Sequence, residues 1–383
     1  MKVGKVNTGR AFDMRKLVTL ILLAGMVSTL ITGCTKEKMQ EWVAPLTAEI
    51  YAQEGAVDEK KEEKESGEPL LIPEIDTSIR IKEGISIAVV GRTKKGAYWK
   101  ELRNGMKKAV ADINAAYGFD KDKQVTLAFD GPDSDTDVEN QINILDAVLS
   151  ENPDVLCVAP IDKESCQAQL EVAAENNIPV IAFDSNVESS DLVTAYRAVD
   201  NHRIGEVGAY RLAVAIGKMG KVAVFSGSRK NQSNSARIKG FQDFISAYGD
   251  IEVVRIVSKD EVEDMTMAIQ EVLEQYPTLA GVFCTDAETS ELYLSIQKEE
   301  TRDAVAMIGV EATQRQQEAV KKGEEIGVIA QSSYAVGYHA IWAAVCAASR
   351  MQAEELPNQI LLPPVWITRD NIEDPSLADY LLS

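Results

Sequence analysis

Short apolar segments alternate with longer amphipathic ones along most of this chain, from Gly84 to about Ala330. In the longer segments the apolar residues recur every three or four positions, which is typical of a helix with one buried face. The short segments are apolar throughout, which is typical of strands covered on both sides. Strands that alternate with helices form parallel sheets with helices on both faces. The strands are predicted at residues 85–90, 125–129, 155–159, 178–183, 222–225, 252–257, 279–284, 305–310 and 327–330, with a further apolar stretch at 192–199.

The number of strands bears on the domain organisation. About ten strands are more than one small doubly wound sheet normally holds. Roughly 300 residues remain beyond the N-terminal region, which is enough for two domains of ordinary size. The pattern therefore predicts an α/β fold of two doubly wound parallel-sheet lobes.

Polar side chains follow most of the predicted strands. Ligands of open parallel sheets bind beyond the carboxyl ends of the strands. Carboxylates there accept charge-assisted hydrogen bonds from vicinal hydroxyls such as those of sugars. A single aspartate after a strand more often caps a helix or forms a turn, but several together favour a shared site. The residues that close the strands are Asp130, Asp184, Asp200, Asp286, Glu311 and Gln331.

Two adjacent aromatic residues, Tyr98 and Trp99, follow the first predicted strand. The C–H face of a sugar ring packs against a flat apolar surface, and an aromatic ring supplies one. This pair is therefore a candidate stacking surface for a sugar.

Other chemistries find little support in the sequence. The loop from Gly91 to Gly96 is neither a dinucleotide-binding nor a phosphate-binding motif, and no GxSxG sequence occurs. Asp133, Asp135 and Asp137 lack the glycine and the glutamate of a calcium-binding loop. The chain has two histidines and no CxxC, so we expect no metal site and no cofactor. Cys157, Cys166, Cys284 and Cys346 are predicted to be buried thiols rather than a disulfide framework.

The N-terminal region carries a targeting signal. Basic residues precede an apolar run at 17–31, and the small residue Gly33 precedes Cys34. This arrangement resembles a bacterial lipoprotein signal, in which the cysteine is lipidated after cleavage. An ordinary signal peptide and a buried apolar helix are the alternatives, and either Met1 or Met14 is the start. We therefore predict a signal peptide at 1–33, lipidation at Cys34, and an extracytoplasmic protein anchored to the membrane.

The region that follows is rich in charge. Residues 54–68 are almost entirely charged or small, so they cannot bury enough apolar area to offset the entropy of ordering. We interpret residues 34–83 as a flexible tether. The formal net charge is −20, and it becomes −24 once the five basic residues and one acidic residue of the signal are removed. An acidic surface of this kind argues against binding to nucleic acid.

From about Gly84 to Leu362 the chain resembles the type 1 periplasmic sugar-binding proteins of ABC importers, the ribose-binding-protein-like group. Each matching motif is short, and their order and spacing carry the resemblance. The resemblance implies two lobes that close on a ligand about a three-segment hinge. The matching stretches are 85–90 with Tyr98-Trp99, Ile178-Pro-Val-Ile-Ala-Phe-Asp184, Val199-Asp-Asn201, Ala236-Arg-Ile-Lys-Gly-Phe241, Val282-Phe-Cys-Thr-Asp286, Ile308-Gly-Val-Glu311 and Ile329-Ala-Gln331.

The resemblance also implies a role for particular residues. Tyr98 and Trp99 match an aromatic pair that stacks on the sugar, Asp184 matches an aspartate that binds ring hydroxyls, and Gln331 matches a glutamine near the hinge. Asp286 and Glu311 fall where the family often has asparagine and aspartate. The predicted ligand-binding residues are Tyr98, Trp99, Asp184, Ser235, Asp286, Glu311 and Gln331.

One position departs from the family in a way that affects the expected ligand. Ser235 stands where a ligand-contacting arginine is common, and Arg237 matches a second arginine that more often packs structurally. Asn231, Gln232 or Asn234 are candidates to compensate. The pocket is therefore expected to be acidic with no clear basic partner, which leaves open a pentose, a hexose, a polyol or an amine-bearing sugar.

The predicted lobes are 84–199 plus 332–362, including a helix in the latter stretch, and 200–331 plus 363–383. The function implied is a monomeric solute-binding protein, not an enzyme, that delivers a carbohydrate to an ABC permease. A ligand sensor that feeds a membrane histidine kinase or a chemoreceptor is the alternative. A remote alternative is an extracytoplasmic hydrolase that uses paired carboxylates.

Overall fold

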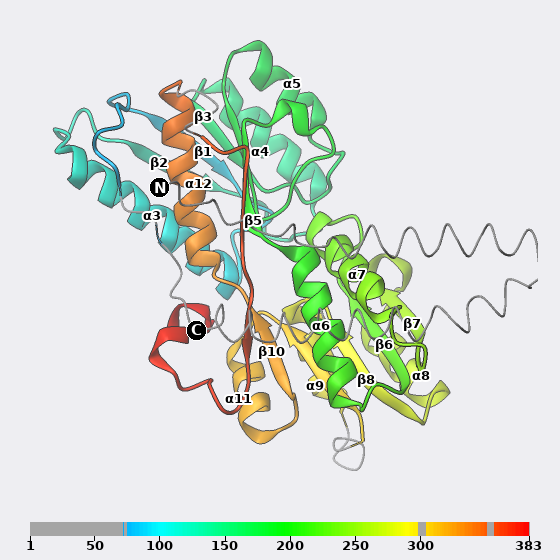
Figure 1. The fold of residues 1–383 in the computed structure, drawn as a ribbon. Helices are drawn as coiled ribbons and strands as arrows, with labels where there is room; N and C mark the ends of the chain where they lie inside the picture. The colour runs from blue at the N-terminus through cyan, green and yellow to red at the C-terminus, as the bar shows by residue number, and fades with distance from the viewer. Residues whose placement is uncertain (1–71, 73–74, 298–303, 351–355, 383) are drawn as a thin grey trace, which may run out of the picture. The chain divides into compact units, whose positions relative to one another are not determined.

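A computed structural model describes residues 72, 75–297, 304–350 and 356–382 of the chain. These residues form two six-stranded sheets with helices on both faces, which confirms the predicted fold class (Figure 1). The predicted signal peptide, Cys34 and nearly all of the tether lie outside the described residues.

The first sheet contains only parallel pairs. Its strands lie in the order β11-β5-β4-β3-β1-β2, and the central strand β1 pairs Ile87 with both Leu127 and Val155. Alternate strand residues face opposite sides, so one face packs on α3 (Ala97–Tyr117) and α12 (Ser333–Ala348) and the other on α4 (Val138–Ser150) and α5 (Gln167–Glu175). The strands are β1 (Ser86–Val90), β2 (Thr126–Asp130), β3 (Val155–Val158), β4 (Val180–Phe183), β5 (Ala195–Val199) and β11 (Gln359–Leu362).

The second sheet repeats this plan with one antiparallel edge. Its order is β12-β10-β9-β8-β6-β7, and only the pair β10–β12 is antiparallel. Helices α6 (Asn201–Ala215) and α7 (Gln232–Ile245) cover one face, and α8 (Met265–Gln275) and α9 (Ala287–Ile296) cover the other. The strands are β6 (Gly220–Ser226), β7 (Ile251–Ser258), β8 (Leu279–Cys284), β9 (Ala306–Val310), β10 (Gly327–Ala330) and β12 (Val365–Ile367), and α11 (Gln314–Lys322) lies between β9 and β10.

Helices α3 and α12 pack closely because glycines lie at their contact. A Cβ atom on Gly105 would overlap with the carbonyl oxygen of Tyr334, and one on Gly337 would overlap with that of Leu102. Glycine therefore lets the two backbones approach each other. This contact fixes the start of α12 beside the middle of α3.

The chain passes from one sheet to the other three times: between β5 and β6, between β10 and β11, and between β11 and β12. The sequence predicted a helix in residues 332–362, but the helix ends at Ala348, and Gln359–Leu362 form strand β11 beside β5. Small apolar residues continue only to Ala348, and the QILL segment precedes two prolines that cannot continue a helix.

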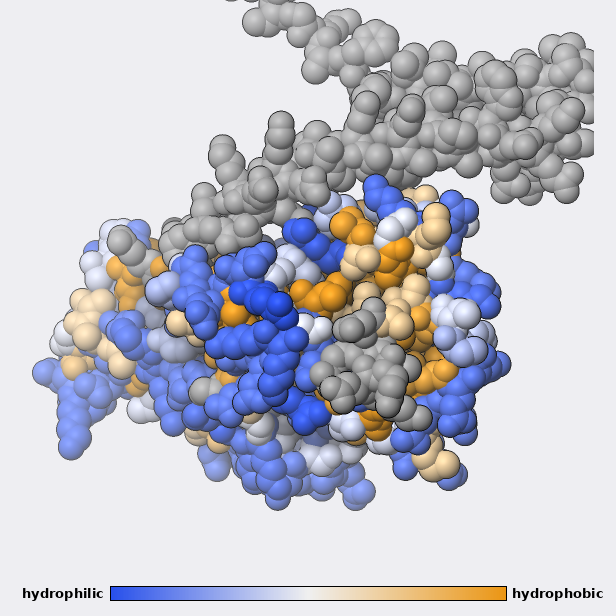
Figure 2. All heavy atoms as spheres, turned by 90° about the horizontal axis from the view of Figure 1, so that it is seen from below, coloured by the Kyte–Doolittle hydropathy of each residue, from blue (hydrophilic) through white to orange (hydrophobic). Residues whose placement is uncertain are grey.

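The surface seen in Figure 2 is largely hydrophilic, with hydrophobic residues gathered in part of that face. Of the described large hydrophobic residues, Met219 is the most exposed, at 62%. Within the described residues, no helix combines the length and the apolar character needed to cross a membrane.

Candidate functional site

The carboxyl ends of both sheets border one cavity of about 260 Å³. Loops after β1, β2, β3 and β4 line it from the first sheet, and loops after β6, β7, β8 and β9 line it from the second. Five of the seven residues predicted to bind ligand line this cavity: Tyr98, Trp99, Asp184, Asp286 and Glu311.

Asp184 is the centre of a buried polar group on the first lobe. Its side chain accepts a hydrogen bond of 2.6 Å from the Tyr98 hydroxyl and lies 3.1 Å from a guanidinium nitrogen of Arg92. Asp184 is buried, and its φ of 60° places it in the left-handed region that Asp tolerates better than most residues. The Ser185 hydroxyl also donates to this carboxylate, at 3.4 Å. A carboxylate has about four lone-pair sites, so acceptor capacity remains beyond these three contacts.

Burial alone would lower the pKa of the Arg92 guanidinium, but the charge of Asp184 and other carboxylates raises it. Burial and the nearby Asp184 carboxylate raise the pKa of Tyr98 well above its usual value. Arg92 therefore remains charged and Tyr98 remains a hydrogen-bond donor at neutral pH.

Trp99 is held by its neighbours as part of the cavity wall. Its ring meets the rings of Tyr98 and Phe183 edge-on, at centroid distances of 5.6 and 6.3 Å. The guanidinium of Arg92 lies 5.4 Å from the centroid of the Trp99 ring, within the range of a cation–π contact. The same arginine thus contacts both Asp184 and Trp99.

On the second lobe, Asp286 is largely occupied by the protein itself. One carboxylate oxygen accepts from the Thr289 N–H at 2.9 Å, which caps α9, and the other accepts from the Gly227 N–H at 2.8 Å. Asp286 therefore caps α9 and lines the cavity at the same time. The hydrogen bonds that cap the helix also hold the carboxylate in the cavity wall.

Arg237 lies beneath the second-lobe wall and is buried. Its guanidinium donates to the side chain of Asn201 at 2.9 Å, to the Thr285 carbonyl at 2.6 Å, and to the Gln331 side chain at 3.2 Å. It also lies 3.9 Å from a carboxylate oxygen of Glu311. Arg237 therefore packs in the interior, as the resemblance implied, and it also lines the cavity.

Glu311 occupies a backbone conformation that is rare for its type. Its φ is 102°, and that of the following Ala312 is 61°. Such conformations persist only where the surroundings hold them, and they cluster at ligand sites. Burial raises the pKa of the Glu311 carboxyl to about 7, although Arg237 acts to lower it.

Two predicted residues do not line the cavity. The Ser235 hydroxyl donates to the Asn231 carbonyl at 2.8 Å, within its own helix α7. Gln331 is buried behind the wall and accepts from Arg237. The structure instead brings Asn231, Ser233 and Asn234, at the start of α7, into the lining.

The prediction of an acidic pocket with no clear basic partner is wrong. Arg92 and Arg237 line the cavity together with Lys95 and Lys259. Arg92 follows the first strand after a single residue, Gly91. Its position near a strand end therefore indicated that it could belong to the site. Arg237 approaches the cavity from within a helix, and only the direction of its side chain shows this.

The two lobes contact each other beside the cavity. The side-chain amide of Asn231 donates to the Ser185 hydroxyl at 3.0 Å, and the Ser233 hydroxyl donates to the Asp184 carbonyl at 3.1 Å. Both bonds join the end of β4 to the start of α7, so the cavity is bounded on this side by direct contact between the lobes.

A larger hollow of about 870 Å³ lies at the opposite end of the first sheet, bordered by Lys82, Asp154 and Arg350. Lys82 and Asp154 already form an ion pair with each other. The cavity at the carboxyl ends is lined by the buried side chains of Asp184 and Arg237 and by the carboxyl group of Glu311, and we therefore take it as the candidate site. No group of three or more metal-ligating side chains occurs among the described residues.

Comparison with known proteins agrees with this geometry. The profile of the periplasmic binding protein domain family matches residues 87–350. The chain is 22% identical over 246 residues to the xylitol-binding protein of Mycolicibacterium smegmatis, which covers 63% of this chain and 68% of the relative. It is 23% identical over 205 residues to the ribose import binding protein RbsB of Bacillus subtilis, which covers 54% of this chain and 66% of that relative. The chain thus spans about two thirds of the length of these two relatives.

Solved structures share the fold over almost their whole length. An ABC transporter solute-binding protein from Agrobacterium vitis, bound with α-D-tagatopyranose, has a TM-score of 0.71 and 24% identity, covering 78% of this chain and 99% of that one. A second solute-binding protein from A. vitis, with bound D-fucose, has a TM-score of 0.69 and 25% identity, covering 77% of this chain and 99% of that one.

Proposed function

Since this chain belongs to the type 1 periplasmic binding protein family, we propose that its cavity captures a single neutral sugar or polyol between the two lobes. The observation that carries the proposal is the grouping of Asp184, Arg92 and Tyr98 beside Trp99. A carboxylate accepts hydrogen bonds from hydroxyl groups, a guanidinium donates to hydroxyl oxygens, and the aromatic ring suits a C–H face.

The size and charge of the cavity narrow the ligand class. Its volume of about 260 Å³ lies just below the range of about 300–1,000 Å³ found for drug-sized ligands, which suits one sugar ring or a short polyol. Four cationic side chains in the lining oppose five carboxylates, so the charge is nearly balanced. This balance favours a neutral ligand over an amine-bearing one. The charged lining residues are Arg92, Lys95, Arg237, Lys259, Asp135, Asp184, Asp286, Glu288 and Glu311.

The three passages of the chain between the sheets support a hinge. We place one lobe at 84–199 plus 332–362 and the other at 200–331 plus 363–383. Closure of the lobes about these passages would enclose the ligand, as in other hinge-closing binding proteins.

Delivery to an ABC permease is the destination we propose. The relatives are named for binding xylitol and for import of ribose, and the solved structures are solute-binding proteins of ABC transporters. These likenesses favour transport over presentation of the ligand to a sensor kinase. A lipid on Cys34 would keep the monomeric binding protein beside the permease.

The proposal is tested by a thermal-shift series on residues 64–383, which form one compact unit. The probes are xylitol, D-ribose, D-tagatose and D-fucose, with D-glucosamine as the amine-bearing comparison. A ligand that binds only the folded state raises Tm by mass action. We expect at least one of the four neutral compounds to raise Tm by several degrees at millimolar concentration. A shift with D-glucosamine alone would contradict a neutral ligand, and no shift with any compound would contradict the proposed function.

Replacing Cys34 by serine tests the anchor. A serine cannot take up the thioether-linked lipid, so the variant is expected in the soluble fraction of lysed cells, whereas the unchanged chain stays with the membranes. Cys166→Ser is the matched control, because Cys166 is a buried cysteine of the folded body. Equal membrane retention of the Cys34 variant would show that something other than a lipid at this residue holds the protein.

A further inference from the structure

The C-terminal segment, which we define as residues 368–382, turns back after β12 toward the cavity. Its first turn is closed by a hydrogen bond of 2.7 Å from the Thr368 N–H to the Asn371 side chain. A short 3₁₀ helix η3 (Pro375–Tyr380) follows, capped by Asp374. In Figure 1 this segment, coloured red, lies beside α11 and near the lower end of α12.

The segment is folded onto the second lobe. Ile372, Leu377 and Tyr380 are buried in one apolar cluster with residues of β10 and β12. Leu381 packs against the same cluster and is partly buried. The path of the segment toward the cavity is thus set by apolar burial and by backbone contacts.

Leu382 is tied to the loop that carries Glu311. Its N–H donates to the Ala312 carbonyl at 3.1 Å. The side-chain amide of Gln317 donates to the carbonyl of Ala312 at 2.9 Å and to that of Leu382 at 3.0 Å. We call this arrangement the Gln317 clamp. It joins the C-terminal segment to Ala312, whose φ angle is positive, as is that of the adjoining Glu311.

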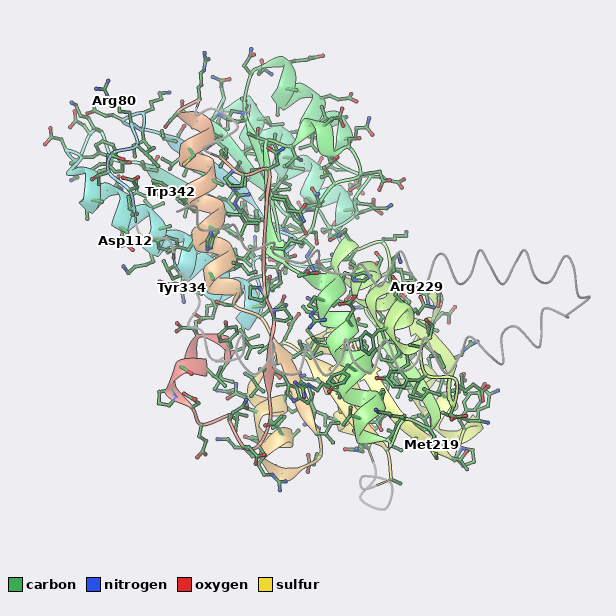
Figure 3. All side chains as sticks on the ribbon, in the orientation of Figure 1. Arg80, Asp112, Met219, Arg229, Tyr334 and Trp342 are labelled. Atoms are coloured by element: carbon green, nitrogen blue, oxygen red, sulfur yellow. The ribbon has the colours of Figure 1, made fainter. Side chains whose placement is uncertain are left out.

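The segment also reaches the first lobe. Figure 3 places Tyr334, at the start of α12, close to the C-terminal segment. Burial raises the pKa of Tyr334, and Asp379 of the segment is among the carboxylates that contribute to this rise. Leu382 is 3% exposed and lines the same cavity as Trp99 and Glu311.

We infer that Leu382 contacts the ligand and that the C-terminal segment forms an apolar part of the cavity wall. This inference rests on the proposed function. The side chain of Leu382 would cover C–H groups of a sugar or polyol while Glu311, held by the adjoining loop, accepts from its hydroxyls. Burial of such C–H groups against a leucine adds affinity without a polar partner. The Gln317 clamp holds Leu382 and the Glu311 loop in register.

The test compares Leu382→Ala with Leu381→Ala in residues 64–383. Both variants remove the same atoms from neighbouring positions, but only Leu382 lines the cavity. Titration calorimetry is done with xylitol, D-ribose, D-tagatose and D-fucose. For a compound that binds the unchanged chain, Leu382→Ala should weaken the affinity about tenfold, whereas Leu381→Ala should change it less than twofold while lowering Tm at least as much. Gln317→Ala, which keeps Leu382 and removes the clamp, should weaken the affinity about threefold.

The outcomes separate the two proposals. If the unchanged chain binds none of the four compounds, the proposed function fails and the role of Leu382 fails with it. If the unchanged chain binds and Leu382→Ala binds equally well, only the role of Leu382 is refuted. Equal weakening by the two leucine variants would show a general effect of the segment on folding and would likewise overturn a contact with the ligand. Unchanged affinity in Gln317→Ala would refute a role of the Gln317 clamp in ligand binding.

Discussion

Replacing Asp184 by asparagine should weaken sugar binding by about a hundredfold or more. The carboxylate holds Tyr98 and Arg92 and retains acceptor sites that face the cavity. Hydrogen bonds to a charged group contribute about 1.5–3 kcal/mol each, and a tenfold change in affinity corresponds to about 1.4 kcal/mol. Loss of one such bond to a ligand hydroxyl, at the upper end of this range, therefore accounts for a loss of about a hundredfold.

Asparagine is the informative replacement at this position. It is among the few residues that tolerate the φ of 60° found here, so the backbone should keep its conformation. The side-chain oxygen can still accept from Tyr98, but the neutral amide leaves the guanidinium of Arg92 without its charge partner. We expect the ligand-free variant to unfold at a lower temperature for this reason, since an uncompensated charge in a largely buried position is destabilising.

The control is Asp130→Asn. Asp130 also closes a strand of the first sheet, but its side chain is exposed and lies outside the cavity lining. Calorimetry at 25 °C and pH 7, well below the unfolding transition, should show that Asp130→Asn binds the sugar with an affinity within twofold of that of the unchanged chain. If Asp184→Asn binds as tightly as Asp130→Asn, Asp184 has a structural role only.

The fold could be predicted from the sequence because apolar runs mark the strands. Part of the site could be predicted because its residues follow the ends of those strands. Apolar runs marked each of the ten strands β1 to β10. Parallel strands bring their carboxyl ends to one edge, so Asp184, Asp286 and Glu311 were found by position alone. Strands β11 and β12 were not predicted, because their short segments follow a helix without the regular alternation that marks the others.

The remaining site residues depend on contacts that have no local pattern. Arg237 lies on the buried face of α7, and its role follows from the direction of its guanidinium toward Glu311. Leu382 reaches the cavity because Leu377 and Tyr380 pack on the second lobe and set the path of the chain. Neither spacing nor residue type distinguishes Leu382 from Leu381 in the sequence.

A second buried carboxyl, that of Glu325, should make the stability of the protein depend on pH. Glu325 is fully buried just before β10, one of its oxygens accepts from Gln316 at 3.4 Å, and the other has no hydrogen-bond partner among the described residues. Burial raises the pKa of Glu325 to about 8, although the hydrogen bonds from Gln316 and the Gly309 N–H act to lower it. Gln316 accepts from the Thr313 N–H through its side-chain oxygen at 3.1 Å, so it is the side-chain amide that faces Glu325. The ionised form is poorly accommodated because it is buried and its second oxygen has no partner among the described residues.

The direction of the effect follows from proton binding. Between the ordinary glutamate pKa of 4.5 and a pKa of about 8, the folded state binds more protons at this residue than the unfolded state does. Stability must therefore fall as pH rises through this range. At about 1.4 kcal/mol for each pKa unit, the loss from this residue over the whole range is on the order of 5 kcal/mol.

Glu325→Gln, which mimics the neutral acid, should remove this loss. Urea unfolding should give the variant and the unchanged chain similar stability at pH 5, and a variant more stable by about 4 kcal/mol at pH 8.5. Glu311, whose pKa is also raised, titrates in both proteins, so the difference between them isolates Glu325.

Glu318→Gln is the control, because Glu318 is exposed on α11 and its pair with Lys322 should contribute less than about 1 kcal/mol. A pH profile of Glu325→Gln that runs parallel to that of the unchanged chain would show that the Glu325 carboxylate ionises without cost, and that water reaches this carboxylate beside Gly309.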